Sequence, residues 1–295
     1  MSKFVIPYRS GRIAVLGDLH LDHWGRAGRN PLRNFQLEEL VRHGLDALII
    51  AGDLINGPPV TLTKAFGFLA GYIAPDRIYF LPGNHDYYRS SLAAVAEMVS
   101  VIEAAGGYFI QQKVLRHGST RFLCVTLWTD YDLLGDREEA MQIAERLMND
   151  HQSISRDAPD PANDFEALLP PSVERRVSVG DLRNLHLQHR AWIEAKLTRL
   201  HPDGAEGQTV VVTHHGPHPL VAGHIDRLTA AFHSDLADLL EAYKNDAWFF
   251  GHSHRHKREG DAGGGIRNVS IGYPEESYNQ LGHLEEACIW KSDHG

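Results

Sequence analysis

Apolar residues gather in five short runs along the chain, and each run ends in a cluster of polar residues. The runs read RIAVLG, DALIIA, RIYFL, QTVVVT and AWFFG, at residues 12–17, 46–51, 77–81, 208–213 and 247–251. Uninterrupted apolar runs of about four to eight residues are typical of strands that are buried on both faces of a sheet. The pattern therefore predicts five buried strands.

Segments with a helical spacing of apolar residues lie between and after the first three runs. Residues 31–43, 61–73 and 90–105 are predicted helices; the first has Pro31 near its start, and two glycines follow the third. Alternation of strand and helix implies a parallel sheet with right-handed crossover connections. The fold class predicted for this half of the chain is α/β.

The alternation of predicted strands and helices ends after residue 107. Short apolar segments at 108–110, 113–116 and 121–127 follow one another at tight spacing, which favours antiparallel pairing. Two more short strands are expected near the end of the chain, at 266–271 and 286–290. The second half of the fold is therefore expected to mix strand directions.

Residues 128 to about 190 are the irregular part of the chain. A helix is predicted at 136–148, a stretch rich in Pro and Asp follows at 157–161, and residues 191–200 belong to an amphipathic helix. The simplest interpretation is a single domain, residues 1–295, with a helical and irregular insertion at about 128–190.

Composition narrows the class of protein. Of the 295 residues 43% are hydrophobic and 23% are charged, which is typical of a globular chain. No apolar run approaches the roughly 18 residues of a membrane span, and no secretion signal is visible at the N-terminus. Two cysteines, Cys124 and Cys288, give neither a disulfide framework nor a cysteine-based metal site. We therefore expect a cytoplasmic protein with no membrane contact.

Net charge and histidine content bear on the ligands that the protein could bind. The formal net charge is −9, whereas proteins that coat nucleic acids or membrane surfaces need a basic field. The chain also contains 19 histidines, a number that fits metal binding, acid–base chemistry or mere composition equally well. Their positions decide between these interpretations.

The polar clusters stand at the ends of the predicted strands, where open α/β sheets bind their ligands. Seven groups could bind metal: Asp18, His20, Asp53, Asn84, His214, His252 and His254. An Asp-x-His or His-x-His pair on an extended segment would point both side chains to one face. Carboxylate, amide oxygen and imidazole suit Mn, Fe, Zn or Co, and seven groups are too many for one tetrahedral ion. They suit two ions about 3.5–4 Å apart that share a carboxylate.

Each cluster alone has an ordinary explanation. A Gly-Asp at a strand end is usually a turn or a helix cap, an Asn in a Pro-Gly-Asn turn is usually turn chemistry, and a lone His pair is usually packed or exposed. Five such clusters in a row, all at strand ends, favour the metal site instead.

The clusters also resemble a known family. Gly17-Asp18-Leu19-His20, Gly52-Asp53, Gly83-Asn84-His85-Asp86, His214-His215-Gly216-Pro217 and Gly251-His252-Ser253-His254 are similar, in order, to the signature blocks of calcineurin-like metallophosphoesterases. The resemblance covers residues 12 to about 272. It implies a four-layer αββα sandwich of two mixed sheets flanked by helices. It also implies hydrolysis of phosphomonoesters or phosphodiesters by two metal ions and the hydroxide that bridges them.

The resemblance assigns roles to individual residues. It implies one metal ion on Asp18, His20 and His254, a second on Asn84, His214 and His252, and a bridge through Asp53. It further implies that His85 is a catalytic residue that protonates the leaving oxygen or stabilises the transition state. Asp86 is a candidate to orient His85.

Residues that choose the substrate are expected in or near the insertion, since loops on a rigid scaffold carry specificity. Trp128 and Tyr131 could stack on a ring or pack within their own loop. His215 could touch substrate, support a ligand or simply be packed. Arg175, Arg176, Arg183 and Arg190 form a basic stretch that could hold a second phosphate or lie on a solvated helix face.

The expected substrate is a phosphorylated small molecule, and three alternatives remain. A nuclease is not excluded, although the net charge of −9 weighs against a basic groove. A protein phosphatase is the second alternative; members of this class typically carry Glu after the Asn-His pair, and Asp86 at that position in this chain weighs against it. A metal-free scaffold should have lost ligands, and none of the eight residues is missing here.

Overall fold

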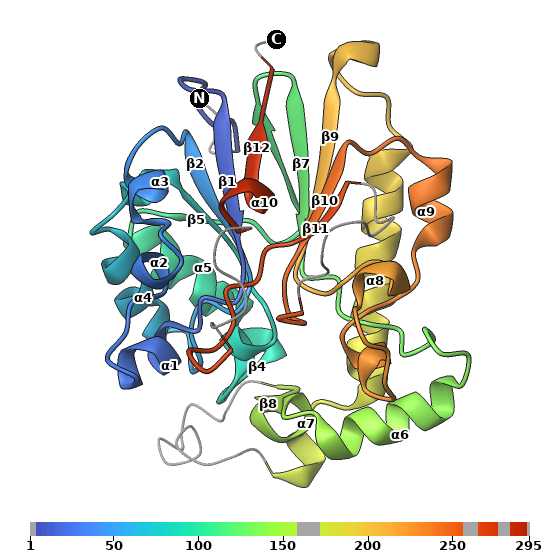
Figure 1. Ribbon diagram of the computed structural model, residues 1–295. Helices are drawn as coiled ribbons and strands as arrows, with labels where there is room; N and C mark the ends of the chain where they lie inside the picture. Colours follow the sequence, from blue (N-terminus) through green and yellow to red (C-terminus); the bar gives the residue numbers. More distant parts are fainter. Residues whose placement is uncertain (1–3, 158–171, 256–264, 277–283, 294–295) are drawn as a thin grey trace.

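The computed structural model describes residues 4–157, 172–255, 265–276 and 284–293. Two five-stranded sheets face each other at the centre of the molecule (Figure 1). The first sheet has the order β12-β1-β2-β3-β5. Its strands are β1 (Arg12–Leu16), β2 (Ala47–Ala51), β3 (Ile78–Leu81), β5 (Tyr108–Phe109) and β12 (Ile289–Lys291).

The second sheet has the order β11-β10-β9-β7-β6. Its strands are β6 (Lys113–His117), β7 (Thr120–Val125), β9 (Gln208–Thr213), β10 (Ala247–Phe250) and β11 (Ile266–Asn268). Each sheet is parallel except for one edge strand: β12 runs antiparallel to β1, and β6 runs antiparallel to β7. Both sheets are therefore mixed.

Helices cover the outer face of each sheet (Figure 1). The first sheet is covered by helices from the first 104 residues: α1 (Leu21–Arg26), α2 (Pro31–Asn34), α3 (Glu38–Arg42), α4 (Thr61–Leu69) and α5 (Val95–Ala104). The second is covered by α8 (Val179–Leu197) and α9 (Ala237–Ala242). The order of layers is helix, sheet, sheet, helix, which confirms the predicted sandwich.

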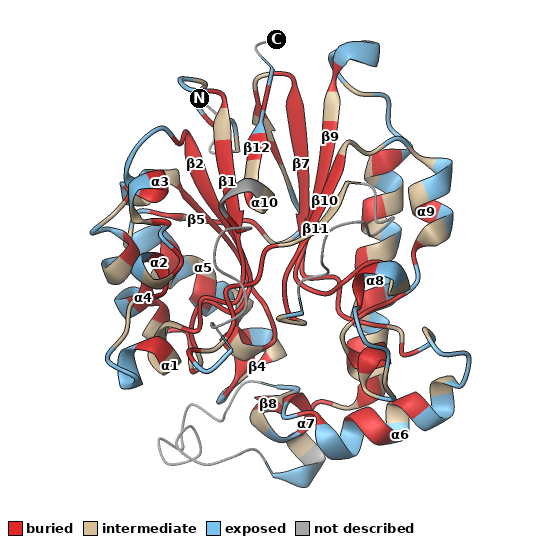
Figure 2. Ribbon diagram, viewed as in Figure 1, coloured by how far each residue is buried: buried red, intermediate tan, exposed pale blue. Residues whose placement is uncertain are grey.

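The inner strands of the two sheets are buried on both faces because both faces are covered. In β7, Phe122 and Cys124 belong to the core between the sheets. The residues that alternate with them, Leu123 and Val125, pack with Ile193 of α8. Figure 2 shows β7 as continuously buried. This two-sided burial is the physical reason for the uninterrupted apolar runs in the sequence.

Three local predictions were wrong. The segment 31–43 is two helices, α2 and α3, because Gln36 between them adopts a left-handed φ of 58°. The segment 90–105 begins with a short strand, β4 (Ser90–Ser91), before α5. The strand at 108–110 pairs parallel to β3, because α5 forms a crossover connection between them.

The predicted insertion contains α6 (Arg137–Leu147), α7 (Asp150–Ser153) and β8 (Ile154–Ser155). Strand β8 pairs with β4 in a separate two-stranded sheet. The predicted boundary at residue 190 lies inside α8, which runs without a break from the insertion onto the second sheet. Residues 158–161 of the stretch rich in Pro and Asp lie outside the described residues.

A short helix, α10 (Leu284–Ala287), precedes β12. In the described ranges, no helix combines the length and the hydrophobicity that crossing a lipid bilayer would require.

Candidate metal centre

The polar ends of the buried strands from the two sheets meet in one place. The backbone N–H of Gly17, after β1, donates to the carbonyl of Val269, after β11, at 2.9 Å. A Cβ atom on Gly251, after β10, would collide with the Asp18 carboxylate. This close approach of the two sheet edges brings together side chains that are far apart in the sequence, such as Asp18 and His254, which are separated by 236 positions.

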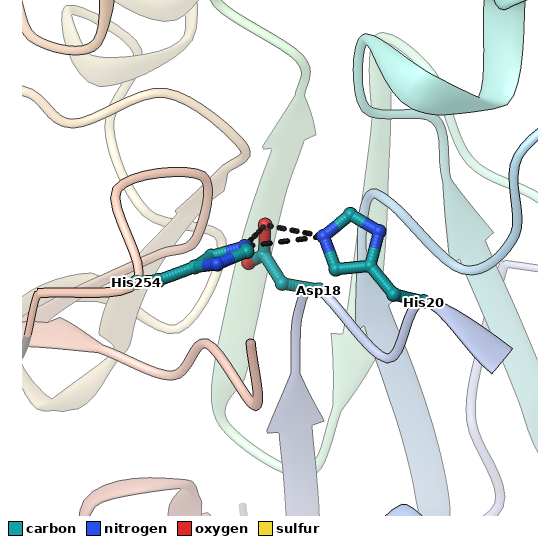
Figure 3. A group of neighbouring side chains, drawn as sticks. All are labelled: Asp18, His20 and His254. Carbon is teal, nitrogen blue, oxygen red and sulfur yellow. Dashed lines mark hydrogen bonds and ion pairs between the residues drawn. The ribbon is translucent and has the colours of Figure 1, made fainter. Parts of the chain in front are cut away.

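One group of side chains consists of Asp18, His20 and His254 (Figure 3). The Nε2 atoms of His20 and His254 lie 3.1 Å apart. Asp18 Oδ1 lies 3.1 Å from His254 Nε2 and 4.0 Å from His20 Nε2. The three side chains point toward one another, so this set could hold a metal ion.

A second group consists of Asp53, His214 and His252, with Asn84 beside it. The Nε2 atom of His214 lies 3.0 Å from Asn84 Oδ1 and 3.4 Å from Asp53 Oδ1. The other ring nitrogen of His214 bonds the Ala51 carbonyl at 2.9 Å, which fixes the ring with Nε2 toward the site.

Asp53 of the second group also reaches the first group. Its Oδ1 faces His214, while its Oδ2 lies 3.9 Å from Nε2 of His20 and 3.9 Å from Nε2 of His85. The carboxylate therefore presents one oxygen to each group.

The donor set fits a metal ion on chemical grounds. The Nε2 atom of His252 is buried and has no hydrogen-bond partner among the described residues. Burial holds the pKa of His20 and of His252 well below the ordinary value, so both rings keep a lone pair free. Although burial opposes it, the Asp18 carboxylate raises the pKa of His254 to about 10. A neutral imidazole offers the lone pair that a metal ion requires, and the carboxylate that holds a proton on His254 would attract a metal ion in place of that proton.

Five of the seven candidate ligands have left-handed backbone. The φ angles are 56° at Asp18, 39° at His20, 54° at Asp53, 68° at His252 and 49° at His254. The Asp-x-His and His-x-His pairs therefore do not lie on extended segments, as the sequence interpretation assumed. Tight turns at the strand ends aim these side chains inward, and such strain in residues with a Cβ is typical of functional sites.

His85 lies at the edge of the same site, with a side chain that is 15% exposed. Its ring stacks on Tyr88, with 4.2 Å between ring centroids. Its Nδ1 atom lies 2.5 Å from Oδ1 of Asn56. Asn56 in turn donates through Nδ2 to Asp22 at 3.2 Å, so its oxygen faces His85.

The prediction that Asp86 orients His85 was wrong. The buried Asp86 carboxylate accepts hydrogen bonds from four backbone N–H groups, those of Asp53, Leu54, Ile55 and Gly83. It ties the turn after β2 to the turn after β3. Asn56 occupies the orienting position instead. The available sequence signal was a polar residue only three positions after Asp53.

Trp128, Tyr131 and His215 are not among the residues that line the cavity over the candidate metal ligands. Trp128 is 2% exposed and packs on His215, with 5.2 Å between ring centroids. Tyr131 is 3% exposed and belongs to a small core under α6. His215 is buried and close to the Thr126 carbonyl. For these three residues the packing interpretation agrees with the structure and the substrate-binding one does not.

A cavity of about 620 Å³ opens over the proposed ligands. Its lining combines polar side chains, among them Asp53, Asn84, His85, His252 and His254, with an apolar wall of Leu147, Met148, Ala222, Leu228 and Phe232. Arg255 is the only Lys or Arg in its described lining, and it pairs with Asp226 at 3.4 Å. None of the four predicted basic residues between 175 and 190 lines the described cavity.

Comparison with known proteins agrees with this geometry. Residues 11–256 match the model of the calcineurin-like phosphoesterase family. One similar solved structure is the phosphopantetheinyl hydrolase of Mycobacterium tuberculosis, with a TM-score of 0.63 and 19% sequence identity. The alignment covers 91% of this chain and 92% of that one. No curated protein sequence matches the chain significantly.

The family match spans all five motif clusters, and the side chains of these clusters meet in one site. A metal-dependent hydrolase of phosphoric esters is the class of enzyme that this combination supports. The chain belongs to the calcineurin-like phosphoesterases.

Proposed function

We propose that the chain is a phosphoesterase with two metal ions that hydrolyses phosphodiesters of small molecules. The observation that carries the proposal is Asp53, whose two carboxylate oxygens face two separate groups of nitrogen and oxygen ligands. Asp18, His20 and His254 would hold one ion, and Asn84, His214 and His252 the other. Mn, Fe, Zn and Co all suit this donor set.

The two ions, when bound, would supply a water of low pKa and neutralise the phosphate oxygens. The protein's own side chains would hold these ions and shape the surroundings of the phosphate. Asp53 and Asp18 carry the negative charge that keeps the ions close together. The buried rings of His214 and His252 exclude bulk water from this side of the cavity, which strengthens electrostatic interactions with a bound phosphate.

His85 is proposed as the proton donor to the leaving oxygen. Its Nδ1–H can donate to Asn56 Oδ1, which fixes the ring. In the protonated ring, Nε2–H then points toward the position between Asp53 and the open cavity. A histidine held in this way can transfer its proton to an alkoxide near neutral pH.

The cavity lining supports a phosphodiester with an apolar or flexible arm. Beyond the two ions, the described lining offers a phosphate only one Lys or Arg, Arg255, which is already paired with Asp226, and a diester carries one negative charge fewer than a fully ionised monoester. The wall of Leu147, Met148 and Phe232 suits an aliphatic or aromatic substituent. The structural relative named above acts, by its name, on a phosphopantetheinyl group, which is a flexible arm of this kind.

The two cysteines support the expected cytoplasmic location. Cys124 and Cys288 are free and buried, so neither depends on an oxidising compartment.

The test combines metal analysis with a pair of substrates. Elemental analysis should find up to two transition ions per chain, and bis-p-nitrophenyl phosphate should be cleaved faster than p-nitrophenyl phosphate with Mn²⁺ present. Asp53→Ala should lose both ions and turnover, and His85→Ala should keep the ions but lower kcat. Two tightly bound ions in Asp53→Ala would exclude the bridging role, and faster cleavage of the monoester would exclude the substrate class.

A further inference from the structure

The predicted insertion places a carboxylate directly behind one of the proposed metal ligands. Asp150, the first residue of α7, is 4% exposed. Its Oδ1 atom accepts a hydrogen bond from Nδ2 of Asn84 at 2.7 Å and another from the hydroxyl of Tyr88 at 2.7 Å. Asn84 and Asp150 are 66 positions apart in the sequence, and the link between them joins the insertion to the metal centre.

This contact decides which end of the Asn84 amide faces the metal centre. The NH₂ and the oxygen of an asparagine side chain have nearly the same shape, but only the oxygen can bind a cation. A carboxylate accepts hydrogen bonds and cannot donate them, so Asp150 favours the orientation with Nδ2 toward itself. In that orientation Oδ1 faces His214, at 3.0 Å from its Nε2. Tyr88 supports the same orientation, since its hydroxyl also accepts from Nδ2, at 3.3 Å.

We propose that Asp150 is a positioning residue for Asn84, so that the insertion completes one of the two metal sites. The inference rests on the proposed two-metal function, because Asn84 is a ligand only there. It assigns a role in metal binding to a segment whose sequence pointed to substrate selection.

Backbone contacts around Asp150 hold the insertion in place independently of its side chain. Strand β8 pairs with β4, and the backbone N–H of Arg89 donates to the carbonyl of Ser153 at 2.8 Å. Ile154, next to these residues, is completely buried. Replacement of the Asp150 side chain should therefore leave α7 against the turn that carries Asn84.

The same stretch of chain also forms part of the cavity wall. Leu147, Met148 and Asn149 line the cavity, and Asp150 follows them directly. A ligand that presses on this wall would push on the residue that holds Asn84. The insertion thus connects the substrate side of the cavity with one metal site.

The experiment titrates metal-free protein with Mn²⁺ by calorimetry and compares three variants. Asp150→Ala should lower the binding affinity for one of the two ions by about 10- to 100-fold, which is the usual effect of losing a partner that orients a ligand. Asp150→Asn should stay near wild type, because both hydrogen bonds go to the same oxygen and an amide oxygen can accept both. Glu145→Ala, which removes an exposed carboxylate from α6 in the same segment, is the control and should bind as wild type.

Each outcome is informative. Two ions bound with wild-type affinity by Asp150→Ala would overturn the inference. Equal weakening in Asp150→Asn and Asp150→Ala would also overturn it, since the charge and not the orientation would then act. Fewer than two ions in the wild-type protein would contradict the proposed function instead. Should Asp150→Ala not fold by circular dichroism, Asp150→Ser replaces it with the same expected result, because serine is well tolerated at a helix start.

Discussion

The buried carboxylate of Asp86 offers a sharp test of how the site is held together. Its Oδ2 accepts the backbone N–H groups of Asp53 and Gly83, each at 2.8 Å, and its Oδ1 accepts those of Leu54 at 3.1 Å and Ile55 at 3.3 Å. Asparagine has only one acceptor oxygen. In Asp86→Asn, two of the four buried N–H groups would therefore face an NH₂ group in either orientation of the amide.

The expected cost follows from these two donors. A buried donor without an acceptor destabilises a protein by about 1–3 kcal/mol. Asp86→Asn should thus lower the free energy of unfolding by roughly 2–6 kcal/mol, twice that penalty. Asp86→Ala, in which all four N–H groups lose their acceptor, should be at least as unstable.

The assay is urea unfolding of metal-free protein, which separates the effect on the fold from any effect on metal binding. Asp76→Asn, at an exposed aspartate, is the matched control and should change the unfolding free energy by less than about 0.5 kcal/mol. An Asp86→Asn variant as stable as the wild type, with a lowered kcat, would refute the reasoning. That result would restore Asp86 as the residue that orients His85.

Three other predictions follow from the same kind of contact. Three backbone N–H groups of the N-terminal segment bond the buried Asp46 and, against the effect of burial, lower its pKa to about 2 from an ordinary 3.8. The ionised carboxylate should therefore contribute about 2 kcal/mol of stability above pH ~4, and this contribution should be lost toward pH ~2. In urea unfolding, the difference in unfolding free energy between wild type and Asp46→Asn should shrink over this pH range. Gly83→Ala would place a Cβ 2.6 Å from the backbone nitrogen of Asp53 and closer still to its carboxylate, so elemental analysis should find fewer bound ions. Asn56→Ala should lower kcat by about 10-fold or more with the ions retained, since His85 loses the partner of its Nδ1; unchanged turnover of a diester with a poor leaving group would contradict this.

The two sheets and the gathering of the candidate ligands could be predicted because both follow from simple patterns. A strand buried on both faces must be apolar throughout, so β2 and β9 stand out in the sequence. Parallel strands bring their carboxyl ends to one edge, so the sequence alone indicates that Asp18 and Asp53 meet. These features depend on local sequence and on a general rule of topology.

Other features depend on contacts that the sequence does not encode locally. Asn56 and Asp86 are both polar and both near His85, and only their positions in space show which one bonds its ring. The contact of Asp150 with Asn84 joins segments that no motif connects. An aromatic residue such as Trp128 can pack in a core or stack on a ligand with the same chemistry, so its burial had to be observed.

The left-handed backbone of the proposed ligands has a consequence for the stability of the fold. A left-handed φ in a residue with a Cβ costs about 1–2 kcal/mol, and five of the ligands share it, from Asp18 to His254. The sum is comparable to the whole stability of a typical domain, about 5–15 kcal/mol. Glycine would relieve this strain at every one of the five positions. The Asp and His residues at these five positions therefore lower the stability of the fold, and the gain that offsets this cost is the chemistry of their side chains.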